Sequence, residues 1–216
     1  MNYNIKERIV CSLDWIINAY KEVVGQQLPL DFVAYTLDSI IRALDYAHRN
    51  GFIFQNLTSC NIFFTDTGRL LIIPAGMLKM SELFRMEHAY SATSLPWTPP
   101  EIILARCEIN AAANVYTLGI IACQLAFLTV PYRDFEPVEM LNHKCKNEFP
   151  PLPLERRVPN SLLKFILRCT SSDQKQRATL HELQQMNFLQ KNFNPVVDVC
   201  RILYDLLAVR YVSLKN

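Results

Sequence analysis

Hydrophobic residues recur at helical spacing along much of the chain, and this pattern predicts a mainly helical protein. Residues 12–25, SLDWIINAYKEVVG, form the first predicted helix, with Ser12 as a plausible N-terminal cap. Residues 28–51, LPLDFVAYTLDSIIRALDYAHRNG, form a longer helix that Gly51 is expected to end. In this longer helix the apolar residues fall close to the helical period, at Phe32, Tyr35, Ile40, Leu44 and Ala47.

A small β-hairpin is predicted directly after these two helices. Two short apolar runs, NIFF at 61–64 and RLLII at 69–73, flank the sequence TDTG at 65–68. A glycine-bearing turn between two such runs is typical of a hairpin. The pattern indicates this single β-ribbon within an otherwise helical chain.

The longest uncharged stretch lies between Glu108 and Arg133, and it reads INAAANVYTLGIIACQLAFLTVPY. Its length would nearly span a bilayer. However, Asn110, Asn114 and Gln124 interrupt it, a proline closes it, and no basic cluster flanks one side. A helix that is apolar all round can equally be the central helix of a large globular domain. We favour the buried helix, and we expect no membrane association.

Four further helices are predicted in the C-terminal half. The first three lie around residues 137–146, 161–171 and 177–186. The last is expected to open at Asn194 as its cap, with Pro195 at its first helical position, and to extend to residue 212. One side of this last helix is charged and the rest is largely apolar. We expect it to pack on the body of the protein, and a partner-binding helix is the alternative.

Composition narrows the class of protein. With 216 residues, half of them hydrophobic and 19% charged, the chain suits one globular domain or a large part of one. The net charge is +2 with scattered basic residues, so we expect no nucleic-acid surface. The largest basic cluster, Lys144 with Lys146, is expected on a solvated helix face.

The cysteines bear on the compartment. Seven cysteines without a CxxC pair indicate neither a disulfide framework nor a zinc site. No secretory leader is apparent at the start of the sequence, and reduced thiols are the simplest interpretation. We therefore expect a cytoplasmic protein, with the nucleus as a second compartment.

Five motifs stand in an order and at spacings that resemble the C-terminal lobe of a eukaryotic protein kinase, over residues 10–192. IFQNLTSCN occupies the place of the catalytic loop I-H-R-D-L-K-x-x-N, and PAG the place of D-F-G. PPE stands for A-P-E, NVYTLGIIACQL resembles the D-V-Y-S-L-G-I helix, and QRATLHEL resembles R-P-S-A-x-x-L-L. The resemblance implies a mainly α fold: a kinase-like C-lobe with one small β-hairpin and no N-lobe.

The resemblance also implies that the catalytic chemistry has been lost. Asn56 stands where the kinase aspartate accepts the substrate proton, and an amide cannot act as that base. Pro74 stands where the D-F-G aspartate holds magnesium, and Thr58 replaces the loop lysine. Asn61 is kept, and we expect it to shape the loop rather than to bind metal. Asp66, in the hairpin turn, is poorly placed to support an unorthodox phosphotransferase.

Nucleotide binding is not expected either. In kinases a glycine-rich loop, a strand lysine and its glutamate partner precede this region. Only residues 1–10 precede the first predicted helix here, and we interpret them as a remnant of the hinge. With five glycines in the whole chain, no phosphate-cradling loop is expected elsewhere. We expect no cofactor and no bound metal ion.

The kinase resemblance implies that three residues help to maintain the fold. Glu101 and Arg177 match the A-P-E glutamate and its buried arginine, and we expect an ion pair between them. Asn114 matches the aspartate that braces the catalytic loop through backbone N–H groups. Because its amide carries no charge, we expect a weaker brace.

Two segments, SATSLPWTPPEII and NVYTLGIIACQLAFLTVPYRDFEPVEML, look closest to the STRAD pseudokinases, which are related to the sterile-twenty kinases. The resemblance implies an inactive adaptor that binds and allosterically activates a tumour-suppressor serine/threonine kinase, in a complex with an armadillo-like scaffold protein. Partner contacts are then expected at Tyr90, Leu95, Trp97 and the helix near Met140. For Trp97, packing within the lobe is an equal alternative.

The chain departs from STRAD proteins at both ends. Those proteins have an N-terminal lobe and a short W-E-F-like tail, whereas this sequence ends in VRYVSLKN. We therefore divide the chain into a hinge remnant at 1–10, a kinase-like lobe at 11–192 and a helical extension at 193–216. A stand-alone interaction module, or a shortened isoform that does not activate a kinase, is the alternative function.

Overall fold

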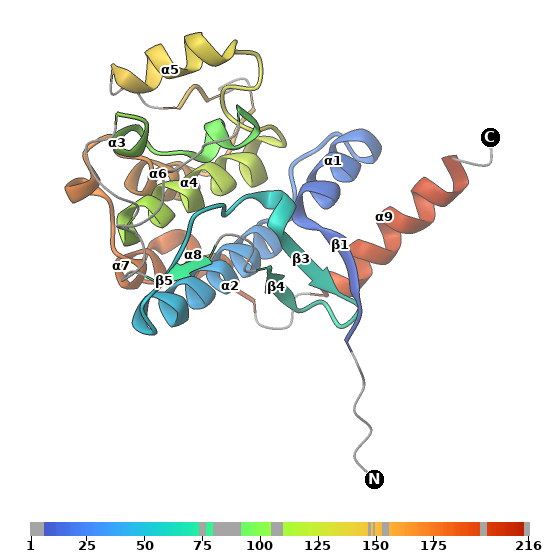
Figure 1. Cartoon of the computed structure of the whole chain (residues 1–216). Coiled ribbons are helices and arrows are strands. Elements are labelled where there is room, and N and C mark those ends of the chain that lie inside the picture. Colours follow the sequence, from blue (N-terminus) through green and yellow to red (C-terminus); the bar gives the residue numbers. More distant parts are fainter. Residues whose placement is uncertain are drawn as a thin grey trace.

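A computed structural model describes residues 7–73, 77–79, 92–104, 110–146, 148, 150–152, 156–194 and 198–213. Helices form most of the body (Figure 1). They are α1 (Leu13–Val23), α2 (Leu30–Arg49), α3 (Pro100–Ile103), α4 (Ala111–Phe127), α5 (Pro137–Cys145), α6 (Asn160–Cys169), α7 (Leu180–Gln184), α8 (Asn187–Asn192) and α9 (Val199–Ser213). The described residues also include the short 3-10 helices η1 (Ser59–Asn61), η3 (Ala92–Trp97) and η4 (Gln174–Gln176).

Local sequence signals set the ends of the first two helices. The Ser12 hydroxyl accepts a hydrogen bond from the Trp15 backbone N–H at 3.1 Å, which confirms it as the cap of α1. Helix α2 ends at Arg49, and Gly51 follows with a φ of 78°. Only glycine adopts that left-handed backbone without a steric penalty, so the predicted stop is confirmed.

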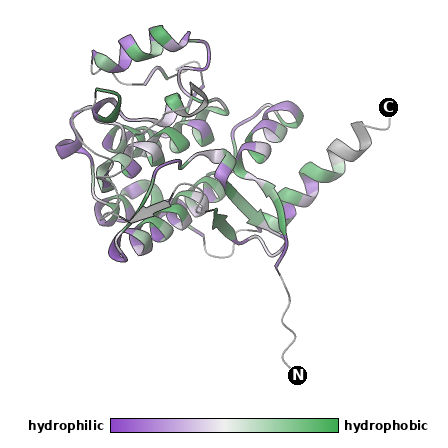
Figure 2. Cartoon of the chain, viewed as in Figure 1, coloured by the Kyte–Doolittle hydropathy of each residue, from purple (hydrophilic) through white to green (hydrophobic). Residues whose placement is uncertain are grey.

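The β-structure is larger than the single hairpin predicted. The hairpin itself is present as β3 (Ile62–Thr65) and β4 (Leu70–Ile72), with Phe63 opposite Leu71. Strand β1 (Ile9–Ser12) pairs antiparallel with β3, giving a three-stranded sheet in the order β1-β3-β4. A second sheet joins β2 (Phe52–Phe54) to β5 (Met77–Lys79). Hydrophobic residues predominate in the three-stranded sheet (Figure 2).

The uncharged stretch forms the central helix of the core, as the sequence predicted. Almost every residue of α4 is buried, including the polar Asn114 and Gln124. The helix packs most extensively against α6, and Gly119 makes the close approach possible. A Cβ added at Gly119 would lie 2.6 Å from both Cys169 Cβ and Thr170 Cγ2. Across the part of the chain that the structure describes, no helix is both long and apolar enough to cross a membrane.

The last helix begins later than predicted. Helix α9 starts at Val199, and the Asp198 carboxylate caps it by accepting a hydrogen bond from the Arg201 backbone N–H at 2.8 Å. Asn194 therefore is not its cap, and the predicted first helical position, Pro195, lies outside the described residues. Its apolar side packs against α1 and the hairpin turn, burying Val199, Leu203 and Leu206 in the main core. In Figure 1, α9 and α5 lie at opposite ends of the molecule.

Candidate pseudoactive site and docking face

The loop between β2 and η1 carries Asn56 and Thr58, two of the positions that the sequence comparison predicts to replace kinase catalytic groups. Asn56 is exposed, Thr58 is buried, and the Asn61 side-chain amide donates a hydrogen bond to the Asn56 carbonyl at 2.9 Å. Asn61 is therefore engaged in shaping the loop. Pro74 lies outside the described residues. Asp66 is held in the hairpin turn, where its carboxylate accepts a bond from the Arg8 backbone N–H at 3.1 Å.

Asn114 connects this loop to the central helix through both atoms of its side-chain amide. Its Oδ1 accepts the Phe54 backbone N–H at 3.1 Å, and its Nδ2 donates to the Phe54 carbonyl at 2.6 Å. The same Oδ1 lies 3.0 Å from His48 Nε2. An ionised carboxylate could accept but could not donate to the carbonyl. Asn114 thus makes a contact that the sequence argument, which considered only acceptance, did not anticipate.

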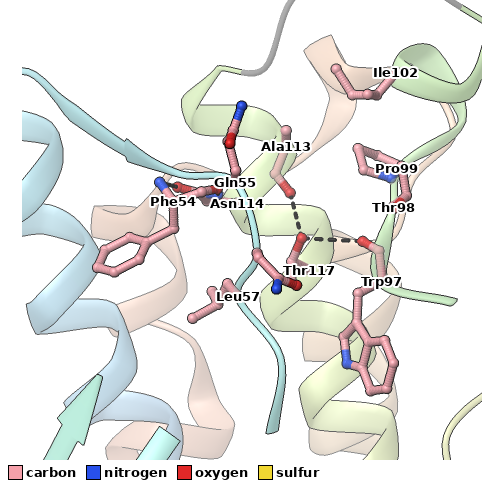
Figure 3. Close-up of a pocket in the computed structure, with 11 residues that line it drawn as sticks. Phe54, Gln55, Leu57, Trp97, Thr98, Pro99, Ile102, Ala113, Asn114 and Thr117 are labelled. Carbon is pink, nitrogen blue, oxygen red and sulfur yellow. Dashed lines mark hydrogen bonds between the residues drawn. The ribbon is translucent and has the colours of Figure 1, made fainter. Parts of the chain in front are cut away.

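A small hollow lies between the catalytic-like loop, α4 and residues 95–99, LPWTP, which we call the ledge. Thr117 of α4 lines this hollow (Figure 3). Its hydroxyl is within donating distance of the Trp97 carbonyl at 3.2 Å and of the Ala113 carbonyl at 3.1 Å. The interior volume is about 20 Å³, roughly the room that one water molecule needs. It has no room for a nucleotide. None of the described residues that line it is ionisable.

The described residues offer no metal centre. No three histidine, cysteine, aspartate or glutamate side chains among them gather closely enough to hold an ion. One carboxylate contacts the end of this loop. Asp14 accepts hydrogen bonds from the Ser59 hydroxyl at 3.1 Å and from the Gln124 side-chain amide at 3.0 Å. Burial, followed by the charge of Asp14, raises the pKa of the neighbouring Cys60 thiol. Residues 54–61 themselves carry no carboxylate or imidazole, and the one thiol among them, that of Cys60, has a raised pKa.

Glu101 and Arg177 form a buried, two-pronged ion pair below the ledge. Arg177 Nη1 lies 2.6 Å from Glu101 Oε1, and Nη2 lies 2.7 Å from Oε2. Arg177 also donates to the Ser171 carbonyl at 2.8 Å and the Ala112 carbonyl at 3.0 Å. The two charges are paired, and Arg177 also binds the Ala112 carbonyl, so the pair joins α3 to the start of α4.

Lys144 lies in the interior, not on the solvated helix face that the sequence suggested. Its side chain is 0% exposed, whereas that of Lys146 is exposed. Lys144 Nζ donates to the carbonyls of Pro96 at 2.9 Å and Thr98 at 2.6 Å. Burial lowers its pKa well below the usual range, with the charge of Glu101 acting in the opposite direction. Met140 and Lys144 are four residues apart, so this helical spacing could have indicated a shared inward face.

The predicted partner-contact residues lie mostly beneath the surface. Leu95 is 8% exposed and Met140 is 5% exposed, and both pack with Tyr132 in a small core between the ledge and α5. Trp97 is half-buried and packs against the main core, and Tyr90 lies outside the described residues. Leu95 and Met140 therefore support the face from within rather than presenting contact surface. The sequence argument missed Val138, which is 69% exposed on α5.

Comparisons with known proteins agree with the kinase-like motifs. The family model described as protein kinase domain matches residues 17–189. STE20-related kinase adapter protein alpha from Homo sapiens is 29% identical over 126 residues, covering 55% of this chain and 29% of that protein. The Gallus gallus protein of the same name is 28% identical, with 55% and 32% covered. Germinal center kinase 3 from Caenorhabditis elegans is 27% identical over 194 residues, with 84% and 33% covered.

These relatives include proteins named as kinase adapters and one named as a kinase, and each match covers about a third of the relative's length. The adapter matches support the STRAD-like resemblance. The family model covers most of the sequence. The chain belongs to the protein kinase domain family.

Proposed function

We propose that this protein is a catalytically inactive pseudokinase adaptor that binds a serine/threonine protein kinase and favours its active conformation. The observation that supports the proposal is the loop at 54–61, whose side chains include no carboxylate. Asn61 donates to the Asn56 carbonyl, and the adjoining hollow is about the size of one water molecule. Loss of the general base alone typically costs about a hundredfold or more in rate.

The docking face of the proposal consists of the ledge, α3 and α5. Val138 supplies exposed apolar surface on α5, and the half-buried Trp97 lies on the ledge. Leu95 and Met140 pack beneath them. A partner kinase is activated only if this face binds its active conformation more tightly than its inactive one. The relatives named as kinase adapters support a kinase as the partner.

At a finer level, the proposed partner is a kinase of the tumour-suppressor type bound by STRAD proteins, in a complex with an armadillo-like scaffold. Residues 11–192 correspond to the large lobe in this proposal, with 1–10 as a hinge remnant and 193–216 as the helical extension. Asn56, Thr58, Asn61 and Pro74 are its degenerate catalytic positions. The expected compartment is the cytoplasm, with the nucleus as a second site.

The test is to mix the purified chain with the purified kinase and scaffold of a STRAD-type complex. Phosphorylation of a peptide substrate is then measured with and without the chain. We expect higher kinase activity with the wild type and with Asn56→Asp, and loss of activation with Val138→Asp. Lys164→Asp on α6, away from the docking face, is the matched control. Activation that Val138→Asp leaves unchanged would refute the docking face, and absence of both binding and activation would refute the proposal.

A second candidate, a stand-alone interaction module, is favoured by α9. The buried side of this helix covers α1 and the hairpin turn, so the chain supplies part of its own outer packing. This candidate predicts a folded protein that binds a partner other than a kinase. Affinity capture with and without residues 193–216, followed by mass spectrometry, separates the two candidates by whether a kinase is recovered.

A further inference from the structure

The ammonium group of Lys144 is bound by backbone rather than by a carboxylate. It donates to the Pro96 and Thr98 carbonyls, which flank Trp97 on the ledge. The nearby carboxylate of Glu101 is already engaged by both Nη atoms of Arg177. A fully buried lysine is uncommon, because removing its charge from water is costly unless the group is paired. The cost here is offset by contacts to one short stretch of main chain.

Aromatic rings form the walls around this group. Lys144 Nζ lies 5.2 Å from the ring centre of Tyr116 and 4.9 Å from that of Tyr132, within the range of cation–π attraction. Tyr132 has a φ of 68°, a left-handed backbone that costs a tyrosine about 1–2 kcal/mol. Phe135 and His143 pack edge-on against Tyr132 at 5.5 Å each. This packing holds Tyr132 in a conformation that the backbone alone disfavours.

The two carbonyl contacts do not depend on the charge of Lys144. Burial lowers its pKa, yet a neutral amine still has two N–H donors, which equals the number of carbonyls that it contacts. The link between α5 and the ledge therefore holds in either protonation state.

We infer that Lys144 is the positioning residue of the docking face. Through the Pro96 and Thr98 carbonyls it joins α5 to the ledge, so that Val138 and Trp97 are presented to a partner as one rigid surface. The role in partner binding rests on the proposed function, whereas the link between α5 and the ledge concerns this chain alone. Leu95, Tyr132 and Met140 fill the space beside the same link and add apolar packing to it.

The experiment compares Lys144→Met with Lys146→Met, which removes the same charge from an exposed position two residues away. Both are made in a Trp15→Phe background, so that Trp97 is the only fluorophore of its kind. We expect Lys144→Met to shift Trp97 emission to longer wavelength and to speed amide hydrogen exchange at Leu95, Trp97 and Thr98. Lys146→Met should match the parent in both measurements. Unchanged emission and exchange in Lys144→Met would overturn the inference.

Partner binding is measured separately. If the wild type binds a kinase, Lys144→Met should weaken that affinity by about tenfold or more, because the partner must then order the released ledge on binding. An affinity within about twofold of Lys146→Met would refute the positioning role. If the wild type binds no kinase, the proposed function fails while the Trp97 measurements still decide the role of Lys144.

A measurement on the unmodified protein covers the case in which Lys144→Met does not fold. Native-state hydrogen exchange at increasing sub-denaturing urea reports which segments open together. We expect amides of the ledge and of α5 to merge into one opening reaction with the same urea dependence. A ledge that opens independently of α5 would contradict the inference.

Discussion

Replacing Asn114 with aspartate would restore the carboxylate that the kinase motif carries at this position, and we expect it to destabilise this protein. Asn114 is 2% exposed, and its Nδ2 donates to the Phe54 carbonyl at 2.6 Å. An ionised carboxylate places an oxygen against that carbonyl and leaves the carbonyl without its donor. Losing a buried partner costs about 1–3 kcal/mol, and burying a charge adds to this.

Two groups reduce the penalty. The Phe54 backbone N–H and His48 Nε2 both lie within reach of the other oxygen and stabilise a negative charge there. We therefore expect a net loss of about 3 kcal/mol at pH 8. For a domain of this size, that loss corresponds to a fall in Tm of about 6–12 °C.

The loss should depend on pH in a defined direction. Burial raises the pKa of the introduced carboxyl above its unfolded value of about 3.9. Once protonated, the carboxyl can donate to the Phe54 carbonyl as the amide does. The deficit relative to wild type should therefore be smallest at low pH and should grow as the pH rises through the folded pKa.

Urea unfolding of wild type and Asn114→Asp from pH 5 to pH 8 measures this deficit. Asn114→Ala is the control, because it removes the amide without adding a carboxyl, so only Asn114→Asp should show the pH dependence that comes from the carboxyl itself. An Asn114→Asp variant as stable as wild type at pH 8 would refute the reasoning. A deficit that does not change with pH would refute the protonation argument.

Three further predictions concern the buried ion pair, the packing of α4 against α6, and the reactivity of the cysteines. Arg177→Met should lower the free energy of unfolding by about 3–5 kcal/mol in urea melts, because Glu101 is left buried and unpaired; a loss below about 1 kcal/mol would contradict this. Gly119→Ala should cost about 1–3 kcal/mol, since its Cβ would lie 2.6 Å from Cys169 Cβ; unchanged thermal stability would count against close α4–α6 packing. Cys60 and Cys145 are exposed and should react with a thiol reagent in the native state. The buried Cys123 and Cys169, whose pKa values are raised by burial, should react only after unfolding, as read by mass spectrometry.

Features encoded within a few residues were predictable from the sequence. The Ser12 cap, the Gly51 stop and the glycine-bearing turn each depend on local chemistry, and each is present as predicted. The α4 helix was recognisable because a half-exposed helix would have charged residues on its solvent-facing side, and this stretch has none. The starting point of α9 was misplaced because an Asn-Pro pair and the later Asp198 both suit a helix start, and tertiary packing selects between them.

Two features that depend on distant segments, the extra strands and the burial of Lys144, were not predictable from local chemistry. Strands β1 and β2 have four and three residues, too few to show an alternating pattern, and their partners lie far along the chain. Lys144 was placed on the surface because lysine is rarely buried. Its burial follows from carbonyls that a separate loop brings to it, and nothing in its own helix specifies those acceptors.

The attachment of Lys144 to main-chain oxygens has a consequence for how this protein can diversify. Every residue type has a backbone carbonyl. Substituting the side chains at positions 95–99 therefore does not remove the carbonyl groups to which Lys144 donates. In the proposed docking face, main-chain oxygens hold the segment in place, and its side chains would contact the partner. Such a segment can acquire a new binding preference through substitution while its path through space is inherited unchanged.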